Sequence, residues 1–241
     1  MNTSFKNKKV LAIGAHPDDV EFGCGATMAM LAHAGAELHF VVATDGNRGS
    51  RQHTFEKSTL ISSRKEESLA AAAILGTERV SFLNEEDGNL LADISFKDKI
   101  VKAIRAVKPD LVFTHDPSWY YAINADGSAS VNHTDHRACG TAVIDAVYPL
   151  ARDLQSFPDH IKEGLDAHIV PELYLFTHGK EANYAFDVTG FVEAKIDAIA
   201  AHKSQIDDIE TIAEMMNTRA ATVGRKFGYE QGEGFTRLAF S

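Results

Sequence analysis

The stretch "VLAIGAHPDDVEFG", residues 10–23, decides the fold. Its first part is a short apolar run that is typical of a buried strand. Its second part places an imidazole, a proline and three carboxylates directly after that strand. In open parallel sheets, ligands bind beyond the carboxyl ends of the strands, where loops lead into helices. The stretch therefore predicts a core strand that ends at a polar functional site.

Short apolar runs alternate with longer segments of helical period along the rest of the chain. The expected strands cover residues 10–15, 38–44, 80–83, 111–115, 172–178 and 184–189. The expected helices cover residues 25–34, 60–75, 96–107, 136–148 and 191–205. This alternation predicts an α/β fold with a mostly parallel sheet covered by helices on both faces. No change of composition marks a linker, so we expect one domain over residues 1–241.

Composition and charge exclude several classes of protein. Hydrophobic residues make up 44% of the 241 residues and the net charge is −10, which argues against broad nucleic-acid or anionic-membrane binding. No segment has the ~20 apolar residues of a membrane helix, and the first ten residues lack the apolar core of a signal peptide. Two cysteines, Cys24 and Cys139, do not make a disulfide framework. We therefore expect a cytoplasmic protein.

A dinucleotide site is one alternative for the end of the first strand. Gly23 and Gly25 resemble part of a phosphate-binding loop, and Asp45 resembles a ribose-binding acid. Met28 stands where the third glycine belongs, however, and the glycines begin too far from the strand end. The spacing therefore disfavours this reading.

A nucleophilic cysteine is a second alternative, at Cys24 or Cys139. Cysteine is more often a small buried residue, and a reactive one needs a lowered pKa that a sequence does not reveal. The chain also lacks the Gly-x-Ser-x-Gly elbow of a serine hydrolase.

A metal site is the third alternative, and two histidine-containing motifs favour it. His16 and Asp19 lie three residues apart after the first strand, and His133 and His136 lie three apart in "NHTDHR". The second pair spans an expected helix N-terminus, where residues i and i+3 share a face. Catalytic zinc sites use three imidazole or carboxylate ligands and leave one position for water. Surface histidines and capping aspartates are the plain alternative, but two such motifs on converging loops favour the metal site.

The motifs match a known family in order along most of the chain. "AHPDDVEFGCGATMAMLAHAG", "VVATDGNRGS", "RKEESLAAAAILG", "HTDHRA" and "KIDAIAAHKSQ" together resemble the LmbE/PIG-L family of zinc-dependent N-deacetylases. The resemblance implies a Rossmann-like three-layer fold with its active site at the carboxyl ends of the strands. It also implies removal of an acetyl group from an N-acetylglucosamine-type conjugate.

The resemblance also implies a role for individual residues. His16, Asp19 and His136 would hold Zn²⁺, although Fe²⁺ or another divalent ion suits the same ligands. Asp18 would be the general base. The remaining implied roles are an oxyanion-stabilising and proton-donating His133, a supporting catalytic acid at Asp135 that keeps His133 protonated, and substrate binding by Arg64 and Asp87.

Some positions depart from the family pattern. Thr134 replaces the usual proline of the second motif, and Asn47 and Arg48 stand where a glutamate is common. Arg48 either contacts an anionic or sugar group or faces solvent. Trp119 and Tyr120 either stack on a sugar or plug the sheet edge. The substrate's other groups therefore stay open.

The expected partner is a small N-acetyl amino sugar conjugate, with no nucleic acid or membrane, and the sequence leaves assembly into a homo-oligomer open. Two other functions share these residues. One is a metal-dependent amidohydrolase or esterase with a non-sugar substrate, and the other is a non-catalytic metal- or sugar-binding protein.

Overall fold

The computed structural model describes residues 5–49, 56–123, 126–177 and 182–240. Within these ranges, seven strands form one sheet in the order β3-β2-β1-β4-β7-β9-β8. The neighbours from β3 to β7 pair in parallel, whereas β9 runs antiparallel to both β7 and β8. The strands are β1 (Lys9–Gly14), β2 (Glu37–Thr44), β3 (Val80–Glu85), β4 (Leu111–His115), β7 (Glu172–Phe176), β8 (Tyr184–Asp187) and β9 (Gly232–Ala239). The expected mostly parallel sheet is confirmed.

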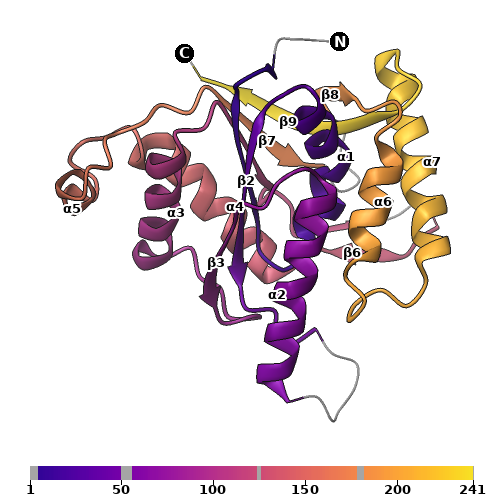
Figure 1. Cartoon of the computed structure of the whole chain (residues 1–241), viewed down its shortest axis with the longest axis horizontal. Coiled ribbons are helices and arrows are strands. Elements are labelled where there is room, and N and C mark those ends of the chain that lie inside the picture. The colour runs from indigo at the N-terminus through magenta and orange to yellow at the C-terminus, as the bar shows by residue number, and fades with distance from the viewer. Residues whose placement is uncertain (1–4, 50–55, 124–125, 178–181, 241) are drawn as a thin grey trace.

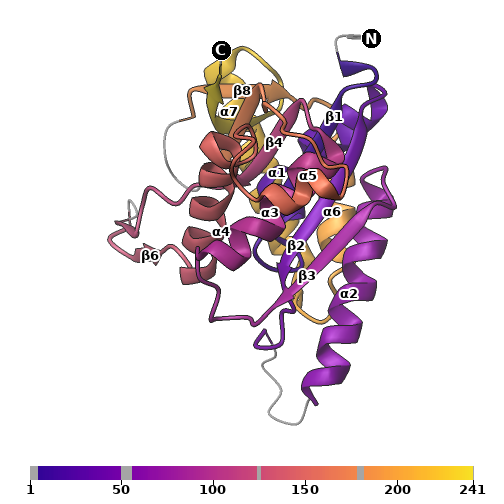
Figure 2. The ribbon, with the colours of Figure 1, turned by 90° about the vertical axis from the view of Figure 1, so that its left-hand side faces the viewer.

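Helices cover both faces of this sheet, which gives three layers (Figure 1). One face carries α1 (Asp19–His33), α2 (Lys57–Ile74), α6 (Val192–Ala200) and α7 (Ile209–Phe227). The other carries α3 (Ile94–Val107), α4 (Thr134–Asp145) with the π-helical turn η2 (Ala146–Leu150), and α5 (Pro158–Lys162). Figure 2 faces this second layer.

Alternation along the strands divides the core in two. Val10 and Ala12 of β1 pack into the cluster under α1 and α6, while Leu11 and Ile13 pack into the cluster under α3 and α4. Successive side chains of a strand point to opposite faces, so an all-apolar strand must be covered on both. The apolar run of β1 therefore accounts for its central place in the sheet.

The chain reverses its direction of travel across the sheet beside β1. From β1 it proceeds outward to β2 and β3, then returns to place β4 on the other side of β1. Open α/β sheets bind ligands at such a switch point, beyond the carboxyl ends of the two strands. The loops after β1 and β4 lie at that position.

Two helix boundaries differ by more than three residues from those expected. Helix α1 begins at Asp19 rather than at residue 25, because glycines at 23 and 25 concealed its first turn. Helix α6 ends at Ala200 rather than at residue 205. The expected strand 172–178 ends at Phe176, and His178 lies outside the described residues.

Five elements had not been expected from the sequence. They are the hairpin strands β5 (Tyr121–Ile123) and β6 (Ala129–Val131), the short helix α5, the long helix α7 and the strand β9. The C-terminal tail, whose structure the sequence left undefined, forms the end of α7 and then β9. Strand β9 lies between β7 and β8 in the sheet.

Candidate metal centre and active site

The turn after β1 brings its two ends close together. The backbone N–H of His16 donates to Oδ2 of Asp19 at 2.6 Å, and the N–H of Asp19 donates to the carbonyl of His16 at 3.3 Å. A Cβ on Gly14 would lie 2.8 Å from the Cβ of Asp19, closer than real Cβ atoms approach. Glycine at this position therefore lets Asp19 fold back over the end of the strand.

Asp18 has a backbone conformation that only glycine adopts easily. Its φ is 126°, a value that is strained for any residue other than glycine. Oδ2 of Asp18 lies 3.5 Å from Nη2 of Arg64, and the Asp18 side chain is 20% exposed. Burial and the adjacent Asp19 raise the pKa of Asp18 to about 7, although Arg64 and His202 oppose them.

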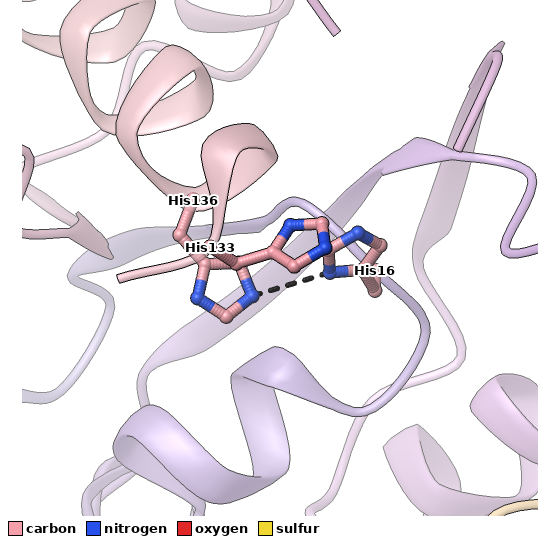
Figure 3. A group of neighbouring side chains, drawn as sticks. All are labelled: His16, His133 and His136. Carbon is pink, nitrogen blue, oxygen red and sulfur yellow. Dashed lines mark hydrogen bonds between the residues drawn. The ribbon is translucent and has the colours of Figure 1, made fainter. Parts of the chain in front are cut away.

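Ligand atoms of His16, Asp19 and His136 lie close to one another in pairs. Nδ1 of His16 lies 3.2 Å from Nε2 of His136 and 3.4 Å from Oδ2 of Asp19. Nε2 of His136 lies 3.1 Å from Oδ1 of Asp19. Figure 3 shows the rings of His16 and His136 meeting at the dashed contact, with His133 beside them. The turn after β1 and the N-terminus of α4 thus supply one cluster.

These separations suit a divalent cation. Ligand atoms about 2.0–2.1 Å from a tetrahedral zinc are about 3.3 Å from one another, which is close to the three distances above. Although burial acts against it, His136 and His115 hold the pKa of Asp19 well below its usual range. The ionised carboxylate and two imidazoles are a donor set that zinc prefers. The residues therefore fit the metal that the sequence implied.

Two carboxylates hold the other nitrogen of His16. Nε2 lies 3.3 Å from Oδ2 of Asp135 and 3.4 Å from Oδ1 of Asp87. Burial lowers the pKa of His16, but Asp135, Asp19 and Asp87 outweigh it and raise the pKa to about 12. Carboxylates that bond the distal nitrogen of a metal-binding histidine fix its ring orientation and increase its basicity. Asp87, expected to bind substrate, thus also orients His16.

The carboxylate of Asp135 contacts His16 rather than His133. It accepts from the N–H groups of Gly88 at 2.6 Å and Leu90 at 3.3 Å, which places it on the far side of the His16 ring. The backbone N–H of Asp135 donates to Nδ1 of His133 at 3.2 Å. The structure therefore differs from the expectation that this acid keeps His133 protonated.

His133 caps the N-terminus of α4, where the sequence predicted a helix to begin. Burial, His16 and His136 lower its pKa, while Asp135 opposes them. Because Nδ1 accepts from a backbone N–H, the neutral ring carries its proton on Nε2. His133 can therefore present a hydrogen-bond donor to the site without a positive charge.

Arg64 is almost fully buried and braces the loops around Asp18. Its Nη1 donates to the carbonyl of Gly46 at 3.0 Å, and its Nη2 donates to the carbonyl of Pro17 at 2.8 Å. Arg64 also lines the cleft described below, so its expected contact with substrate stays a prediction.

His115, the last residue of β4, was not singled out from the sequence. Its ring stacks on that of His136 at a centroid distance of 4.1 Å and an angle of 14°, and its Nε2 accepts from the N–H of Ala15 at 3.1 Å. Burial lowers the pKa of His115 to about 4. Nε2 is also 3.1 Å from Asp19, but parallel stacked rings do not aim their lone pairs at one ion. We therefore assign His115 to packing beneath the ligands.

An open cleft of about 550 Å³ is lined by His16, Asp19 and His136, and its volume is within the range of small-molecule sites. Side chains that the sequence analysis did not assign also line it, among them Phe22, Gln205, Met215, Met216 and Arg219. Met215, Met216 and Arg219 belong to α7, the helix that was not expected from the sequence. They reach the cleft only because the folded chain places α7 beside it.

The structure bears on two questions that the sequence left open. Arg48 lines the cleft, and its Nη2 pairs with Oε1 of Glu86 at 3.1 Å. Trp119 and Tyr120 are not among the described residues that line the cleft, and the guanidinium of Arg137 lies 4.4 Å from the ring centre of Tyr120.

The cysteine alternative loses its basis. Cys24 and Cys139 are both buried, and burial raises the pKa of each thiol. A nucleophilic cysteine needs the opposite shift.

Comparison with known proteins identifies the family of this chain. The family model described as PIG-L, GlcNAc-PI de-N-acetylase, matches residues 11–147. The diacetylchitobiose deacetylase of Thermococcus kodakarensis is 31% identical over 94% of this chain and 82% of its own length. A probable N-acetyl-alpha-D-glucosaminyl L-malate deacetylase 2 of Bacillus cereus is 26% identical over 90% of this chain and 93% of its own length.

A solved structure extends the similarity to three dimensions. The N,N'-diacetylchitobiose deacetylase from Pyrococcus horikoshii, complexed with its inhibitor MPG, superimposes with a TM-score of 0.86 at 31% identity. The match covers 96% of this chain and 84% of that one. The similarity therefore includes the C-terminal elements that the family model does not reach.

Proposed function

The chain belongs to the PIG-L family, and from that premise we propose that it is a hydrolase that removes the acetyl group from an N-acetylated amino sugar conjugate. One observation carries the proposal. His16, Asp19 and His136 place ligand atoms 3.1–3.4 Å apart in pairs, and Asp18 lines the same cleft beside Arg64. A metal-dependent hydrolase needs both a held cation and an uncoordinated base beside it.

The metal is held by His16, Asp19 and His136. We infer Zn²⁺ from the imidazole and carboxylate donors, with Fe²⁺ as the alternative that the same donors accept. When bound, the cation supplies a Lewis acid that lowers the pKa of water and polarises the amide carbonyl. Asp135 and Asp87 keep His16 in the orientation that binding requires.

Asp18 takes a proton from the attacking water. A raised pKa near 7 matches a general base to neutral conditions, because such a base is ionised yet still basic enough to accept the proton. Water oxygen then forms a bond to the amide carbon, and negative charge develops on the former carbonyl oxygen.

The Nε2–H of His133 stabilises that oxygen. A donor of this type contributes about 3–4 kcal/mol to lowering a barrier. Collapse of the tetrahedral species breaks the carbon–nitrogen bond, and the proton taken from water returns to the departing nitrogen through Asp18 or His133. The second proton of the water passes from the new carboxyl group to the amine, so the products are acetate and the protonated amine.

The relatives support the substrate class. They act on diacetylchitobiose or on N-acetylglucosaminyl malate, as their names state, and we propose a related small conjugate here, contacted by Arg64 and Asp87. Within the described ranges no helix is long and apolar enough to span a bilayer. A cytoplasmic location and assembly into a homo-oligomer stay predictions.

The test is acetate release from a panel of N-acetylglucosamine conjugates, including diacetylchitobiose and conjugates with malate or inositol. We expect acetate from at least one member, loss of activity with a chelator, and recovery with zinc. The variant Asp18→Asn controls for a contaminating enzyme.

Other outcomes identify the alternative functions. Acetate only from non-sugar amides or esters would assign the site to a different hydrolase. Tight binding of a conjugate with no acetate release would favour a non-catalytic binding protein.

A further inference from the structure

Helix α1 is broken immediately after the turn that carries the site. Cys24 has φ −149° and ψ 18°, which is not helical, so Asp19–Gly23 forms a separate first turn. This turn holds Asp19 and is preceded by Asp18. Its direction therefore decides where both carboxylates lie.

A buried ion pair from the C-terminal part of the chain bonds the backbone on each side of this break. Nζ of Lys195 donates to the carbonyl of Phe22 at 2.8 Å, before the break. The N–H of Thr27, after the break, donates to Oε2 of Glu233 at 2.7 Å. Lys195 and Glu233 are joined to each other at 2.6 Å. The pair thus bridges the two parts of α1.

The pair comes from two elements that are distant in sequence from the ligands. Lys195 lies in α6 and Glu233 in β9, and their side chains are 7% and 11% exposed. Both lie beyond residues 11–147, which the family model matches. His202, just after α6, also approaches the first turn of α1, because its Nε2 lies 3.6 Å from Oε2 of Glu21.

Stability alone does not explain a buried ion pair at this place. Taking two charges out of water costs several kcal/mol per ion, and apolar residues of similar volume often replace such a pair without loss. Apolar residues could not replace two hydrogen bonds that the pair makes. Lys195 donates to the backbone carbonyl of Phe22, and Glu233 accepts from the backbone N–H of Thr27.

We propose that the Lys195–Glu233 pair is a positioning element of the active site, which holds the broken α1 so that Asp18 and Asp19 reach their working places. The proposal rests on the proposed function for its catalytic readout. Lys195 and Glu233 act through the backbone of α1, so they are positioning residues and not catalytic ones.

The sharpest variant is the double replacement Lys195→Met/Glu233→Met. It removes both charges together, so no uncompensated charge stays buried, and it leaves the carbonyl of Phe22 and the N–H of Thr27 without these partners. The conservative variant is Lys195→Arg, which keeps a charged donor. A cavity of about 40 Å³ lined by Lys195 and Glu233 gives the larger side chain room.

A second ion pair of the same strand provides the matched control. Nη2 of Arg237 in β9 lies 2.9 Å from Oε1 of Glu172, the first residue of β7, at the opposite end of the sheet from the site. The double replacement Arg237→Met/Glu172→Met removes a pair from β9 without touching α1.

The readouts are kcat, KM, zinc affinity and the visible spectrum of the Co²⁺-substituted protein. Loss of a group that orients ligands typically costs about 10–100-fold in metal affinity or activity. We expect the Lys195/Glu233 double variant to lose kcat and zinc affinity in that range, with a changed Co²⁺ spectrum and KM within about twofold. Lys195→Arg and the Arg237/Glu172 control should keep kcat and the wild-type spectrum.

A folded Lys195/Glu233 double variant with wild-type kcat, zinc affinity and Co²⁺ spectrum would overturn the proposal. If that variant does not fold, Glu233→Gln decides, since it keeps an acceptor for Thr27 but no charge. An altered Co²⁺ spectrum for Glu233→Ala supports positioning, whether or not Glu233→Gln keeps the wild-type spectrum, and wild-type spectra for both variants contradict it. Zinc affinity and Co²⁺ spectra do not need a known substrate, so they separate this proposal from the proposed deacetylation.

Discussion

The first 147 residues and the last 94 contribute to the same cleft in different ways. The side chains proposed for the chemistry all come from the first part, in the turn after β1 and at the N-terminus of α4. The last part contributes Gln205, Met215, Met216 and Arg219 to the lining of the cleft, and it supplies the Lys195–Glu233 pair that bonds the backbone of α1.

This difference shows which roles depend on residue type and which depend on position. Metal binding and proton transfer accept only a few side chains at fixed spacing, so they leave short motifs in the sequence. A cleft wall or a bond to a helix backbone accepts many residue types, and only the folded chain brings them there. Four changes test that division, from the largest expected effect to the smallest.

The variant Asp18→Asn removes the proposed base while preserving the shape of the side chain. We expect kcat to fall by about 10³-fold, because general-base catalysis typically contributes 10²–10⁴-fold. Zinc content, measured by elemental analysis, should stay at one ion per chain, since Asp18 is proposed as the base and not as one of the three ligands. A loss of zinc in this variant would show that Asp18 is itself a ligand.

The variant His133→Ala removes the proposed donor to the developing negative charge. We expect kcat to fall by about 10²-fold, while KM and zinc content change little. Steady-state kinetics with a substrate identified by acetate release measure both constants. An unaltered kcat would exclude His133 from stabilising the transition state.

Zinc binding should release a proton from His16. The raised pKa of His16 means that the metal-free protein holds this proton at neutral pH, whereas a ligand nitrogen must be free of it. Proton and zinc therefore compete, and zinc affinity should rise about tenfold per pH unit below that pKa. Calorimetry in two buffers of different ionisation enthalpy measures the release, and equal heats in both buffers would contradict it.

The variant Arg219→Ala tests the C-terminal wall. Among the described residues, Arg219 has no carboxylate partner, and its Nη2 donates to the carbonyl of Thr177 at 2.9 Å. We expect KM to rise about threefold to tenfold with kcat unchanged, the signature of lost uniform binding. Arg225→Ala on the same helix, outside the lining of the cleft, is the control. An equal KM for the two variants would remove α7 from substrate binding.

The fold and the convergence of ligands were accessible from the sequence because they depend on pattern. An all-apolar strand such as β1 must be buried on both faces, and parallel strands must end at one edge. Polar residues after β1 and before α4 therefore had to meet, and the distances among His16, Asp19 and His136 agree.

The remaining features depend on contacts that no local pattern encodes. The first turn of α1 was missed because glycines at 23 and 25 reduce helix propensity, while the compensating bonds come from Lys195 and Glu233. Strand β9 was missed because its glycine-rich start resembles a loop. The contact of Asp135 with His16 rather than His133 depends on the N–H groups of Gly88 and Leu90, far away in sequence.

A zinc-loaded crystal, with an anomalous difference map at the zinc edge, tests the central claim most directly. The account predicts one peak about 2.0–2.2 Å from Nδ1 of His16, a carboxylate oxygen of Asp19 and Nε2 of His136, with the carboxylate of Asp18 uncoordinated. A peak bound instead by His115, or by the His16, His133 and His136 rings without Asp19, would contradict it.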